Sequence, residues 1–542
     1  MSSDLMEYFS CVYDDKLKIW KSATEKNKFN NNESMGQVLF ERLNQRPQHK
    51  LQVDDTYNVT ITNAQAVSWA ISIAEYLKEL GLDHKDIVGI SARNSTYLLP
   101  VVLGCFFNCT PFHAVNPDLD EDTVSHCYGL TKPKLIFCDG EIYEKIRSTT
   151  KNYCSMIVTI SEHIEGVSKV LDLLRPTMGE ENYQPQKLVE GPSQTIAILC
   201  SSGTTGKPKA VCISTPSLIS ENPFLTSDLV VFIASGIDWY TGLWFLINNC
   251  LSNFTRIISK RLFDPGYFLE LVRKYQLSYA FLSSRYVAMM VNHPLATKEN
   301  LSSLQAIQFG GSNLSEATLK RFMTLFNENV IVSFGYGITE IGAIAFNLDK
   351  TRTKSVGKLL PNLQLRIINE NGDNLSINEV GEVLINNPIT WKGYYGNPEE
   401  TARALDSQGW FHTGDLGYMD EQHYLYLVDR KKEILKYQGL HYWPNEIEHV
   451  VAEIPDVMDV CVVSVFDEQL GDAAAALIVK TENSLLTEDQ VIEYVKKRLV
   501  LPHKQINAGV YFVAQLPYNS NNKCLRNKAK IMLQSLMVNK NQ

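Results

Sequence analysis

Residues 195–209 read TIAILCSSGTTGKPK, an apolar run followed at once by a loop of hydroxyl, glycine and lysine residues. The run from Thr195 to Cys200 predicts a strand covered on both faces, because its apolar residues are nearly continuous. Gly203 and Gly206 allow the loop unusual backbone angles, so that successive amides can cradle an anion. Further donors and positive charge come from Ser201, Ser202, Thr204, Thr205, Lys207 and Lys209. This combination predicts a site for the β- and γ-phosphates of ATP.

Two other nucleotide-binding patterns are excluded. A Walker loop has four residues between its glycines and a Ser or Thr after its lysine. Here Gly203 and Gly206 are three positions apart, and Pro208 follows Lys207. The Gly-x-Gly-x-x-Gly pattern that opens a dinucleotide-binding βαβ unit is also missing, which argues against a dinucleotide-dependent oxidoreductase.

Short strand-like runs alternate with amphipathic helical patterns over the first three quarters of the chain. One helix is expected after Ser315 as N-cap, with Leu319, Phe322, Met323 and Phe326 on one face. Such alternation predicts an α/β fold with mostly parallel sheets. The strand-like runs are 87–91, 135–138, 156–160, 229–234, 279–282, 306–309 and 330–334.

The pattern changes after Val356. Shorter β-like segments occupy 363–385 and 423–428, with a turn at Asn371-Gly372. The charged stretch from Asp429 to Glu433 then marks a predicted domain boundary.

The remaining residues predict a compact α+β domain. Helical patterns occur near Asn445 and after Thr487, where Thr-Glu-Asp-Gln fits a capping box. The predicted domains are therefore 1–428, which would bind ATP and the acid, and 429–542.

Composition narrows the class of protein. A chain of 542 residues is too long for a single hydrophobic core, and a formal net charge of −9 argues against nucleic-acid binding. The 11 cysteines are scattered singly, which suggests a reducing, intracellular compartment rather than a zinc site. Uncharged apolar stretches long enough to span a membrane are missing, so we expect no transmembrane segment.

The residues at the two termini are used to predict the cellular compartment. The N-terminus, MSSDLMEYFS, does not resemble a secretory leader, and the chain ends in Lys540-Asn541-Gln542 rather than Ser-Lys-Leu. We therefore expect a cytoplasmic protein, with the peroxisome as the alternative. The expected partners are small-molecule substrates, and the oligomeric state is left open.

Four later segments carry further polar motifs: GYGITE at 335–340, GWFHTGD at 409–415, VDRKK at 428–432 and PYNSNNKCLR at 517–526. Together with 201–209, and in this order, they resemble the motifs of the adenylate-forming superfamily. That superfamily includes acyl-CoA synthetases, 4-coumarate:CoA ligases, beetle luciferases and nonribosomal-peptide adenylation domains. The similarity covers most of the chain, and the insect luciferase-like acyl-CoA synthetases are the most similar group.

The resemblance implies a fold and a set of small molecules. The fold would be a large N-terminal domain of stacked α/β sheet subdomains plus a β-rich subdomain, followed by a small mobile α+β domain. ATP, Mg²⁺ and coenzyme A would be bound, coenzyme A as a co-substrate.

The resemblance also implies roles in the nucleotide site. Tyr336, with Gly337, would lie against the adenine, Thr339 would contact the α-phosphate, and Glu340 would help to hold Mg²⁺, a hard cation that prefers oxygen ligands. The adenine edge would meet the segment Gly310-Gly311-Ser312.

The ribose and the domain junction are assigned in the same way. Asp415 would accept hydrogen bonds from the ribose hydroxyls, as an anion does well, and Arg430 would make a second ribose contact. Asp429 corresponds to the hinge. Lys436 belongs to a loop that would face the site in the thioester-forming state. His412 is interpreted as a structural partner.

Lys523 is the candidate adenylation lysine. Its ammonium would bridge the acid carboxylate and the α-phosphate, offsetting the repulsion between two anions. Two positions depart from the family pattern, Asn522 and Ala210, where glycine is usual. These departures leave open a reduced activity.

The implied reaction has two halves. The acid carboxylate attacks the α-phosphorus and expels pyrophosphate, and the coenzyme A thiolate then attacks the acyl-adenylate and releases AMP. Rotation at Asp429 would present Lys523 first and the region of Lys436 second.

The acid pocket is expected around Trp239, Tyr240, Gly242 and Gly310. Luciferases carry His-His-Gly-Phe-Gly beside their luciferin, and Asp238 to Gly242 occupies that place here. Trp239, in place of the second histidine, predicts a hydrophobic acid, namely a medium- or long-chain fatty acid, and argues against efficient light emission.

Three alternatives remain. An aromatic-acid ligase of the 4-coumarate type, or a weak luciferase, would use the same motifs with another acid. A catalytically impaired paralogue would bind nucleotide only. A carrier-loading adenylation module is disfavoured, because no carrier-like segment follows the small domain.

Overall fold

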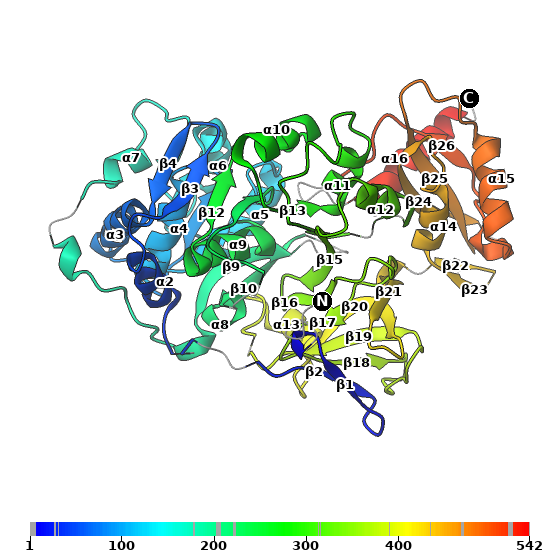
Figure 1. Ribbon diagram of the computed structural model, residues 1–542, viewed down its shortest axis with the longest axis horizontal. Coiled ribbons are helices and arrows are strands. Elements are labelled where there is room, and N and C mark those ends of the chain that lie inside the picture. The colour runs from blue at the N-terminus through cyan, green and yellow to red at the C-terminus, as the bar shows by residue number, and fades with distance from the viewer. Residues whose placement is uncertain are drawn as a thin grey trace.

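Four β-sheets organise the part of the chain that the computed structural model describes, three in a large N-terminal part and one in a smaller C-terminal part (Figure 1). This mixed α/β architecture confirms the predicted fold class. The structure describes residues 7–25, 29–30, 32–176, 179–201, 207–219, 224–312, 314, 316–389, 391–433, 435–438, 440–467, 471–518 and 524–540.

The first sheet contains the strand that leads into the phosphate loop. Its order is β10-β9-β6-β5-β7-β8, parallel throughout except for the antiparallel pair β9–β10. Three predicted runs, 87–91, 135–138 and 156–160, are confirmed as strands. The strands are β5 (Val88–Ser91), β6 (Phe112–Ala114), β7 (Leu135–Cys138), β8 (Met156–Thr159), β9 (Thr195–Ser201) and β10 (Lys209–Ser214).

Apolar runs are continuous in this sheet because helices cover it. Helix α4 (Leu98–Phe107) is buried along its whole length and packs against α3 (Asn63–Glu79). The apolar stretch around α4 is therefore part of the core. Among the described residues, no helix combines the length and the apolarity that crossing a bilayer requires.

The second sheet has nine strands in the order β17-β16-β15-β14-β13-β11-β12-β3-β4. The runs 229–234, 279–282, 306–309 and 330–334 are confirmed as parallel strands in it. The hairpin β3–β4 was not predicted. The strands are β3 (Lys50–Asp54), β4 (Val59–Thr62), β11 (Val230–Ile233), β12 (Thr255–Ile258), β13 (Tyr279–Ser283), β14 (Ala306–Gly310), β15 (Ile331–Ile338), β16 (Gly342–Asn347) and β17 (Lys358–Leu359).

The helix predicted after Ser315 is α12 (Glu316–Thr324), which follows β14. Leu319 and Phe322 are buried, and Phe322 packs edge-on against Phe309 of β14. Ser315, its expected N-cap, lies outside the described residues. The other helices that matter below are α9 (Tyr240–Ser252), α11 (Ser284–Val291), α13 (Pro398–Ala404) and the neighbours α2 (Met35–Asn44), α5 (Glu121–Thr131) and α10 (Pro265–Tyr275).

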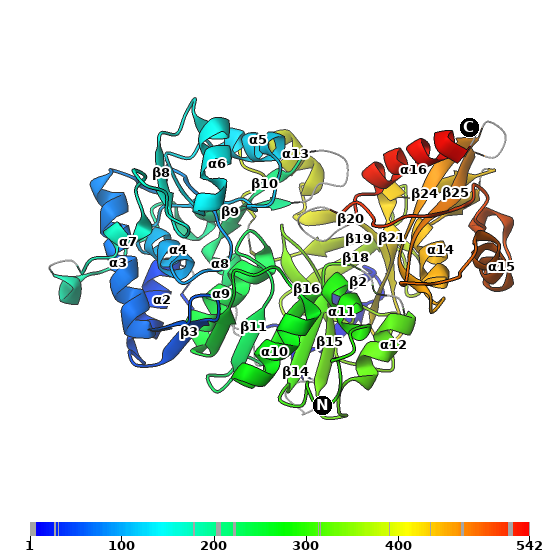
Figure 2. The ribbon, with the colours of Figure 1, turned by 90° about the horizontal axis from the view of Figure 1, so that it is seen from above.

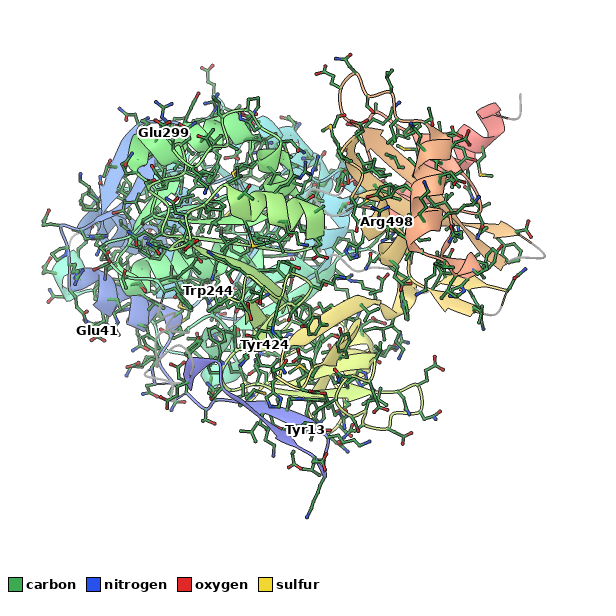
Figure 3. The ribbon with its side chains drawn as sticks, turned by 45° about the vertical axis from the view of Figure 1, so that its right-hand side comes forward. Tyr13, Glu41, Trp244, Glu299, Tyr424 and Arg498 are labelled. Atoms are coloured by element: carbon green, nitrogen blue, oxygen red, sulfur yellow. The ribbon has the colours of Figure 1, made fainter. Side chains whose placement is uncertain are left out.

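The third sheet is antiparallel and forms the predicted β-rich subdomain, in the order β1-β2-β18-β19-β20-β21. Its first two strands come from the N-terminus, where Trp20 is fully buried against the later strands and Tyr13 marks the hairpin in Figure 3. The strands are β1 (Cys11–Asp14), β2 (Ile19–Ser22), β18 (Gln364–Ile368), β19 (Gly381–Asn386), β20 (Trp410–Met419) and β21 (Leu425–Arg430).

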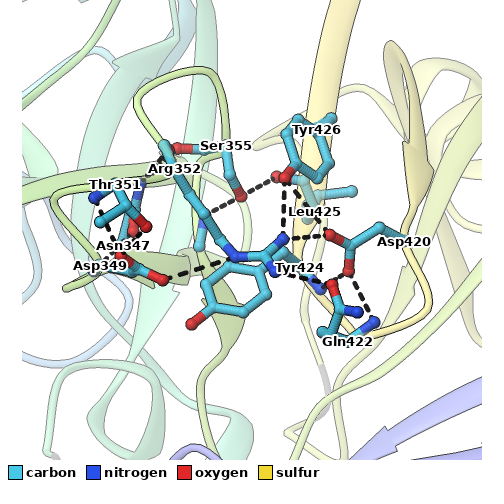
Figure 4. Close-up of polar contacts among 11 residues, drawn as sticks. Asn347, Asp349, Thr351, Arg352, Ser355, Asp420, Gln422, Tyr424, Leu425 and Tyr426 are labelled. Atoms are coloured by element: carbon cyan, nitrogen blue, oxygen red, sulfur yellow. Dashed lines mark hydrogen bonds and ion pairs between the residues drawn. The ribbon is translucent and has the colours of Figure 1, made fainter. Parts of the chain in front are cut away.

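Arg352 fastens the turn of β20 and β21 to the loop before β17 (Figure 4). Its guanidinium donates to Asp420 (2.5 Å), Gln422 (2.6 Å) and Tyr426 (3.2 Å). Ser355 from the same loop donates to the carbonyl of Leu425 (2.8 Å). These contacts hold in place the two strands that carry the predicted ribose-binding residues.

Within the described residues, the small C-terminal part has five strands covered by three α-helices. The predicted capping box at Thr487 is confirmed. The Thr487 hydroxyl accepts a hydrogen bond from the Gln490 backbone amide (3.3 Å), and the Thr487 backbone amide donates to Gln490 Oε1 (2.9 Å). The elements are β22 (Leu435–Tyr437), β23 (Leu440–Tyr442), α14 (Pro444–Val451), β24 (Val457–Asp467), β25 (Gly471–Lys480), α15 (Glu488–Arg498), β26 (Val510–Phe512) and α16 (Arg526–Lys540). In Figure 2, strands β19 to β21 lie between the α/β sheets and this part.

Candidate active site

A cavity of about 1490 Å³ lies where the three sheets of the large part meet. It gathers residues from β9, β10, β14, β15, β21 and the start of α9, which are far apart in sequence. The predicted site residues that line it are Ser201, Lys207, Lys209, Trp239, Tyr240, Gly310, Gly311, Tyr336, Gly337, Thr339, Glu340 and Arg430.

The other predicted site residues either lie outside the described residues or do not line the cavity. The middle of the phosphate loop (Ser202, Gly203, Thr204, Thr205 and Gly206) and Lys523 lie outside the described residues. Five more are described but are not part of the lining, namely Gly242, Ser312, Asp415, Asp429 and Lys436. The roles of all these residues stay predictions.

The two ends of the phosphate loop are held together by strand pairing. Lys209 of β10 lies opposite Ser201 of β9 in the antiparallel register. The Lys209 ammonium donates to Glu400 of α13 (2.5 Å) and lies 4.7 Å from the ring centroid of Tyr394. This hydrogen bond holds the pKa of the Glu400 carboxyl below its usual range. Lys209 therefore lines the cavity with its charge already paired with the Glu400 carboxylate.

Glu340 follows β15 and reaches the same wall. Its Oε1 accepts a hydrogen bond from the Tyr394 hydroxyl (2.7 Å). Burial, followed by the charge of Glu340, raises the pKa of Tyr394, so the phenol stays protonated and donates. Sequence reasoning did not find Tyr394, because it stands alone in a loop far along the chain from Glu340.

The carboxylates of the cavity differ in their suitability for Mg²⁺. The described residues contain no group of three or more His, Cys, Asp or Glu that could hold a metal ion. A magnesium ion held mainly by nucleotide phosphates needs only one or two protein carboxylates. Glu400 and Glu382 are already paired with Lys209 and Lys431. Of these three carboxylates, Glu340, which accepts a hydrogen bond from the neutral phenol of Tyr394, fits such an ion best.

Tyr336, Asp415 and Arg430 form one connected group beneath the cavity. The Tyr336 hydroxyl donates to Asp415 Oδ2 (2.6 Å), and Arg430 Nε lies 3.4 Å from Asp415 Oδ1. The Asp415 side chain is nearly buried, and burial raises the pKa of Tyr336. Each carboxylate oxygen has two acceptor sites. Asp415 therefore retains acceptor capacity for a ribose hydroxyl beside these two partners.

Glycines of the predicted motifs allow neighbouring strands beside the cavity to approach each other closely. A Cβ on Gly310 would lie 2.6 Å from the carbonyl oxygen of Gly335, and one on Gly337 would lie 2.5 Å from that of Gly342. Gly311 adopts a left-handed φ of +97°, which favours glycine. The motif glycines therefore permit the close approach of β14, β15 and β16.

Gly242 has a related function within α9. A Cβ there would lie 1.8 Å from the carbonyl oxygen of Gly236, because the start of α9 packs on the preceding loop. The residue supports the wall that carries Trp239 and Tyr240. It does not itself contact the cavity described here.

Aromatic side chains form one wall of the cavity, contributed by Trp239, Tyr240, Trp244, Phe245 and Phe281. Trp244 and Phe245 pack edge-on at 4.9 Å between ring centroids, and Figure 3 shows Trp244 in the body of the large part. Tyr240 is fixed by donating to the Ser217 carbonyl (2.7 Å). This wall suits a hydrophobic substrate.

Asp238 is a polar residue of this wall that the sequence interpretation passed over. Its Oδ2 accepts from Asn116 (2.8 Å), and burial raises the pKa of its carboxyl to about 6. Its place beside Trp239 was visible in the sequence, but nothing there distinguished it from an ordinary surface aspartate.

The junction with the small part begins inside a strand. Asp429 pairs with Leu416 in the third sheet, and its Oδ1 accepts from the Arg430 amide (2.7 Å). Its Oδ2 is buried with no partner in the described structure, and burial raises the pKa of the carboxyl to about 7. Lys436 lies exposed on β22.

His412 lines the cavity beside a buried carboxylate, and its role as a structural partner stays a prediction. Its Nδ1 lies 3.4 Å from Glu382 Oε1, and Lys431 donates to the other oxygen of Glu382 (2.8 Å). Glu382 is nearly buried beneath the cavity. The three side chains join β19 and β20 to the start of the small part.

Comparisons with known proteins match nearly the whole chain. The family model described as AMP-binding enzyme matches residues 39–395, and the model described as AMP-binding enzyme C-terminal domain matches residues 446–523. The chain is 28% identical over 538 residues to 4-coumarate–CoA ligase 3 of Oryza sativa subsp. japonica, covering 96% of both chains. It is 30% identical over 472 residues to a probable CoA ligase of Humulus lupulus, covering 84% of this chain and 85% of the relative.

Solved structures agree on the fold. ATP-bound MatB from Rhodopseudomonas palustris superposes with a TM-score of 0.83 at 23% identity, covering 94% of this chain and all (100%) of MatB. The luciferase-like enzyme from the nonluminescent Zophobas morio mealworm superposes with a TM-score of 0.68 at 25% identity, covering 76% of this chain and 98% of that enzyme.

Proposed function

Because this chain belongs to the AMP-binding enzyme family, we propose that its cavity activates a hydrophobic carboxylic acid as the acyl-adenylate and passes the acyl group to coenzyme A. The resemblance to the adenylate-forming superfamily is confirmed, and the protein is an enzyme of the adenylate-forming acid–CoA ligase family. The observation that carries the finer proposal is one cavity that unites Lys207, Thr339 and Glu340 with an aromatic wall.

In the first half-reaction, the acid carboxylate attacks the α-phosphorus of ATP and pyrophosphate leaves. Lys207 and Lys209 would attract the phosphates, and Thr339 would donate to the α-phosphate. Lys523 would neutralise charge where the two anions meet. Catalysis of this kind is mainly positioning and electrostatic stabilisation.

Glu340 would hold the Mg²⁺ that accompanies ATP, with Tyr394 orienting its carboxylate through the 2.7 Å hydrogen bond. When bound, the ion would supply positive charge against the phosphates. Asp415 and Arg430 would bind the ribose.

In the second half-reaction, the coenzyme A thiolate attacks the acyl carbonyl and AMP leaves. Lys436 is exposed and away from the cavity lining in this structure, so its segment would have to rotate to take part. We propose that Asp429, buried at the end of β21, is the pivot for that rotation between domains 1–428 and 429–542.

The acid is proposed to be a medium- or long-chain fatty acid, because the wall around Trp239 and Trp244 is apolar and part of a large cavity. An aromatic acid is the second candidate. It is favoured by the number of ring side chains on that wall and by relatives named as 4-coumarate–CoA ligases.

The test is a product analysis with purified protein, ATP and Mg²⁺. Acids from acetate to oleate, together with coumarate, are supplied with and without coenzyme A, and AMP, pyrophosphate and acyl-CoA are quantified by mass spectrometry. Lys523→Ala is compared with Lys528→Ala, a matched change on the exposed side of α16. We expect acyl-CoA only with coenzyme A, and its loss only in Lys523→Ala.

Other outcomes separate the alternatives. Adenylate without thioester would indicate a carrier-loading or oxidative enzyme. ATP binding without any acid-dependent product would support an impaired paralogue, with Asn522 and Ala210 as the first positions to restore to glycine. The compartment, cytoplasm or peroxisome, is tested separately by imaging the tagged protein.

A further inference from the structure

An aromatic contact joins the two parts of the molecule beside the segment that precedes Lys523. Cζ of Arg285, in α11 of the large part, lies 4.1 Å from the ring centroid of Tyr518 in the small part. In Figure 1, α11 and α12 lie on the side of the large part that faces the small part. A guanidinium over an aromatic face is attractive, more so when partly desolvated, and both side chains are half-buried.

Tyr518 is firmly seated in the small part. Its hydroxyl donates to Asp459 of β24, and its ring packs on the cluster that contains Leu516 and Leu533. Arg285 is also close enough to Asp459 to act on the charge of its carboxyl. The contact therefore reaches the central sheet of the small part, not only a surface loop.

Arg285 is held in the large part by the contacts of its two neighbours in the sequence. Its neighbour Ser284 donates to the carbonyls of Gly310 (3.3 Å) and Ser312 (2.5 Å), the segment that borders the cavity. Its other neighbour, Tyr286, stacks on Phe263 at 4.0 Å between centroids. The position of Arg285 is therefore linked, through Ser284, to the segment Gly310-Gly311-Ser312, which would border the adenine.

Tyr518 also marks one end of the segment that contains the proposed adenylation lysine. It forms an antiparallel β-bridge with Cys524, and the Leu525 amide donates to the Pro517 carbonyl (2.8 Å). Lys523 directly precedes Cys524 in the sequence. Whatever fixes Tyr518 against the large part thus also fixes its bridge partner Cys524, the residue that follows Lys523 in the sequence.

We propose that Arg285 is a positioning residue for adenylation, acting by holding Tyr518 so that the small part is docked in the orientation that delivers Lys523. The inference rests on the proposed function. It implies that the contact is used in the first half-reaction and breaks when the small part rotates for the second.

The test measures the two half-reactions separately on the full-length enzyme. Adenylation is followed by acid-dependent ATP–pyrophosphate exchange, and thioester formation by supplying the synthetic acyl-adenylate with coenzyme A. In Arg285→Ala we expect exchange to fall about five- to tenfold, the loss of one cation–π contact, with thioester formation changed less than about twofold. Arg285→Lys, which keeps a cation, should recover part of the exchange rate.

A matched control is available in the same part of the molecule. Cζ of Arg261 lies 4.2 Å from the Tyr267 ring centroid, a contact of the same kind within the large part. Arg261→Ala should leave both half-reactions unchanged. Equal losses in both half-reactions of Arg285→Ala, or no loss in either, would overturn the proposal.

A second measurement does not depend on catalysis. Hydrogen exchange of residues 284–291 and 524–540 should become faster in Arg285→Ala than in the parent and stay unchanged in Arg261→Ala. If the parent formed no adenylate from any acid, the proposed function would fail. Unchanged hydrogen exchange in Arg285→Ala would instead refute the docking contact itself.

Discussion

The role proposed for Glu340 depends on its charge, which a variant of nearly the same shape can remove. Glu340→Gln keeps an acceptor for the Tyr394 hydroxyl and changes little volume. We expect acid-dependent pyrophosphate exchange to fall about a hundredfold, as when a transition-state electrostatic contact is lost. The Mg²⁺ concentration for half-maximal rate should rise.

Tyr394→Phe is the companion variant, because it removes the hydrogen bond and leaves the carboxylate. Its exchange rate should fall less than that of Glu340→Gln, because the carboxylate charge that would hold Mg²⁺ is retained. A Glu340→Gln enzyme with the parent's rate and Mg²⁺ dependence would contradict the assignment.

Gly242 offers a prediction about packing at the same scale. Gly242→Ala places a Cβ 1.8 Å from the Gly236 carbonyl oxygen, so α9 must shift. We expect a loss of about 1–3 kcal/mol in the free energy of unfolding, measured by urea denaturation. Gly129→Ala, in α5 with no atom within 4 Å of the added Cβ, should instead be neutral or stabilising. Equal stabilities for the two variants would refute the packing argument.

At the scale of the element, the end of β21 should make stability depend on pH. Burial raises the pKa of Asp429 to about 7, well above that of an aspartate in an unfolded chain. The folded state therefore binds this proton more tightly than the unfolded state. Its contribution to stability is complete below about pH 4 and is lost as pH rises through about 7.

Asp429→Asn should remove that dependence. Urea midpoints at pH 5 and pH 8 should differ less in the variant than in the parent, by an amount worth up to about 2.7 kcal/mol. The reason is that an unfolded aspartate is already ionised at pH 5, whereas the folded Asp429 carboxyl ionises near pH 7. Asp456→Asn, at an exposed position, serves as the control and should keep the parent's dependence. An unchanged pH dependence in Asp429→Asn would show that another group is responsible.

At the scale of the whole molecule, the division at 428/429 remains a prediction, and proteolysis can test it. Lys431 has a half-exposed side chain at the start of the small part. Limited trypsin treatment should cut first between Arg430 and Lys436, releasing two resistant fragments that mass spectrometry can identify. First cleavage within a central strand of either part would place the boundary elsewhere.

The sequence by itself determined the parts of the structure that depend on local pattern. Continuous apolar runs predicted the buried parallel strands, because strands covered on both faces expose no side to water. The Thr487 capping box was predicted for a similarly local reason, since both of its hydrogen bonds form within one turn. The motif order and the family were also readable, because the chemistry of this family needs particular residue types at short spacing.

Only the tertiary structure decided what depends on residues distant in sequence. The N-terminal hairpin of β1 and β2 joins β18, and β3–β4 completes the nine-stranded sheet. Their pairing partners lie far along the chain, so no local sequence pattern predicts these pairings. Tyr394 on Glu340, Glu400 on Lys209 and Arg285 on Tyr518 are of the same kind. Each is an ordinary side chain in the sequence that gains its role only when packing removes water and brings its partner within bonding distance.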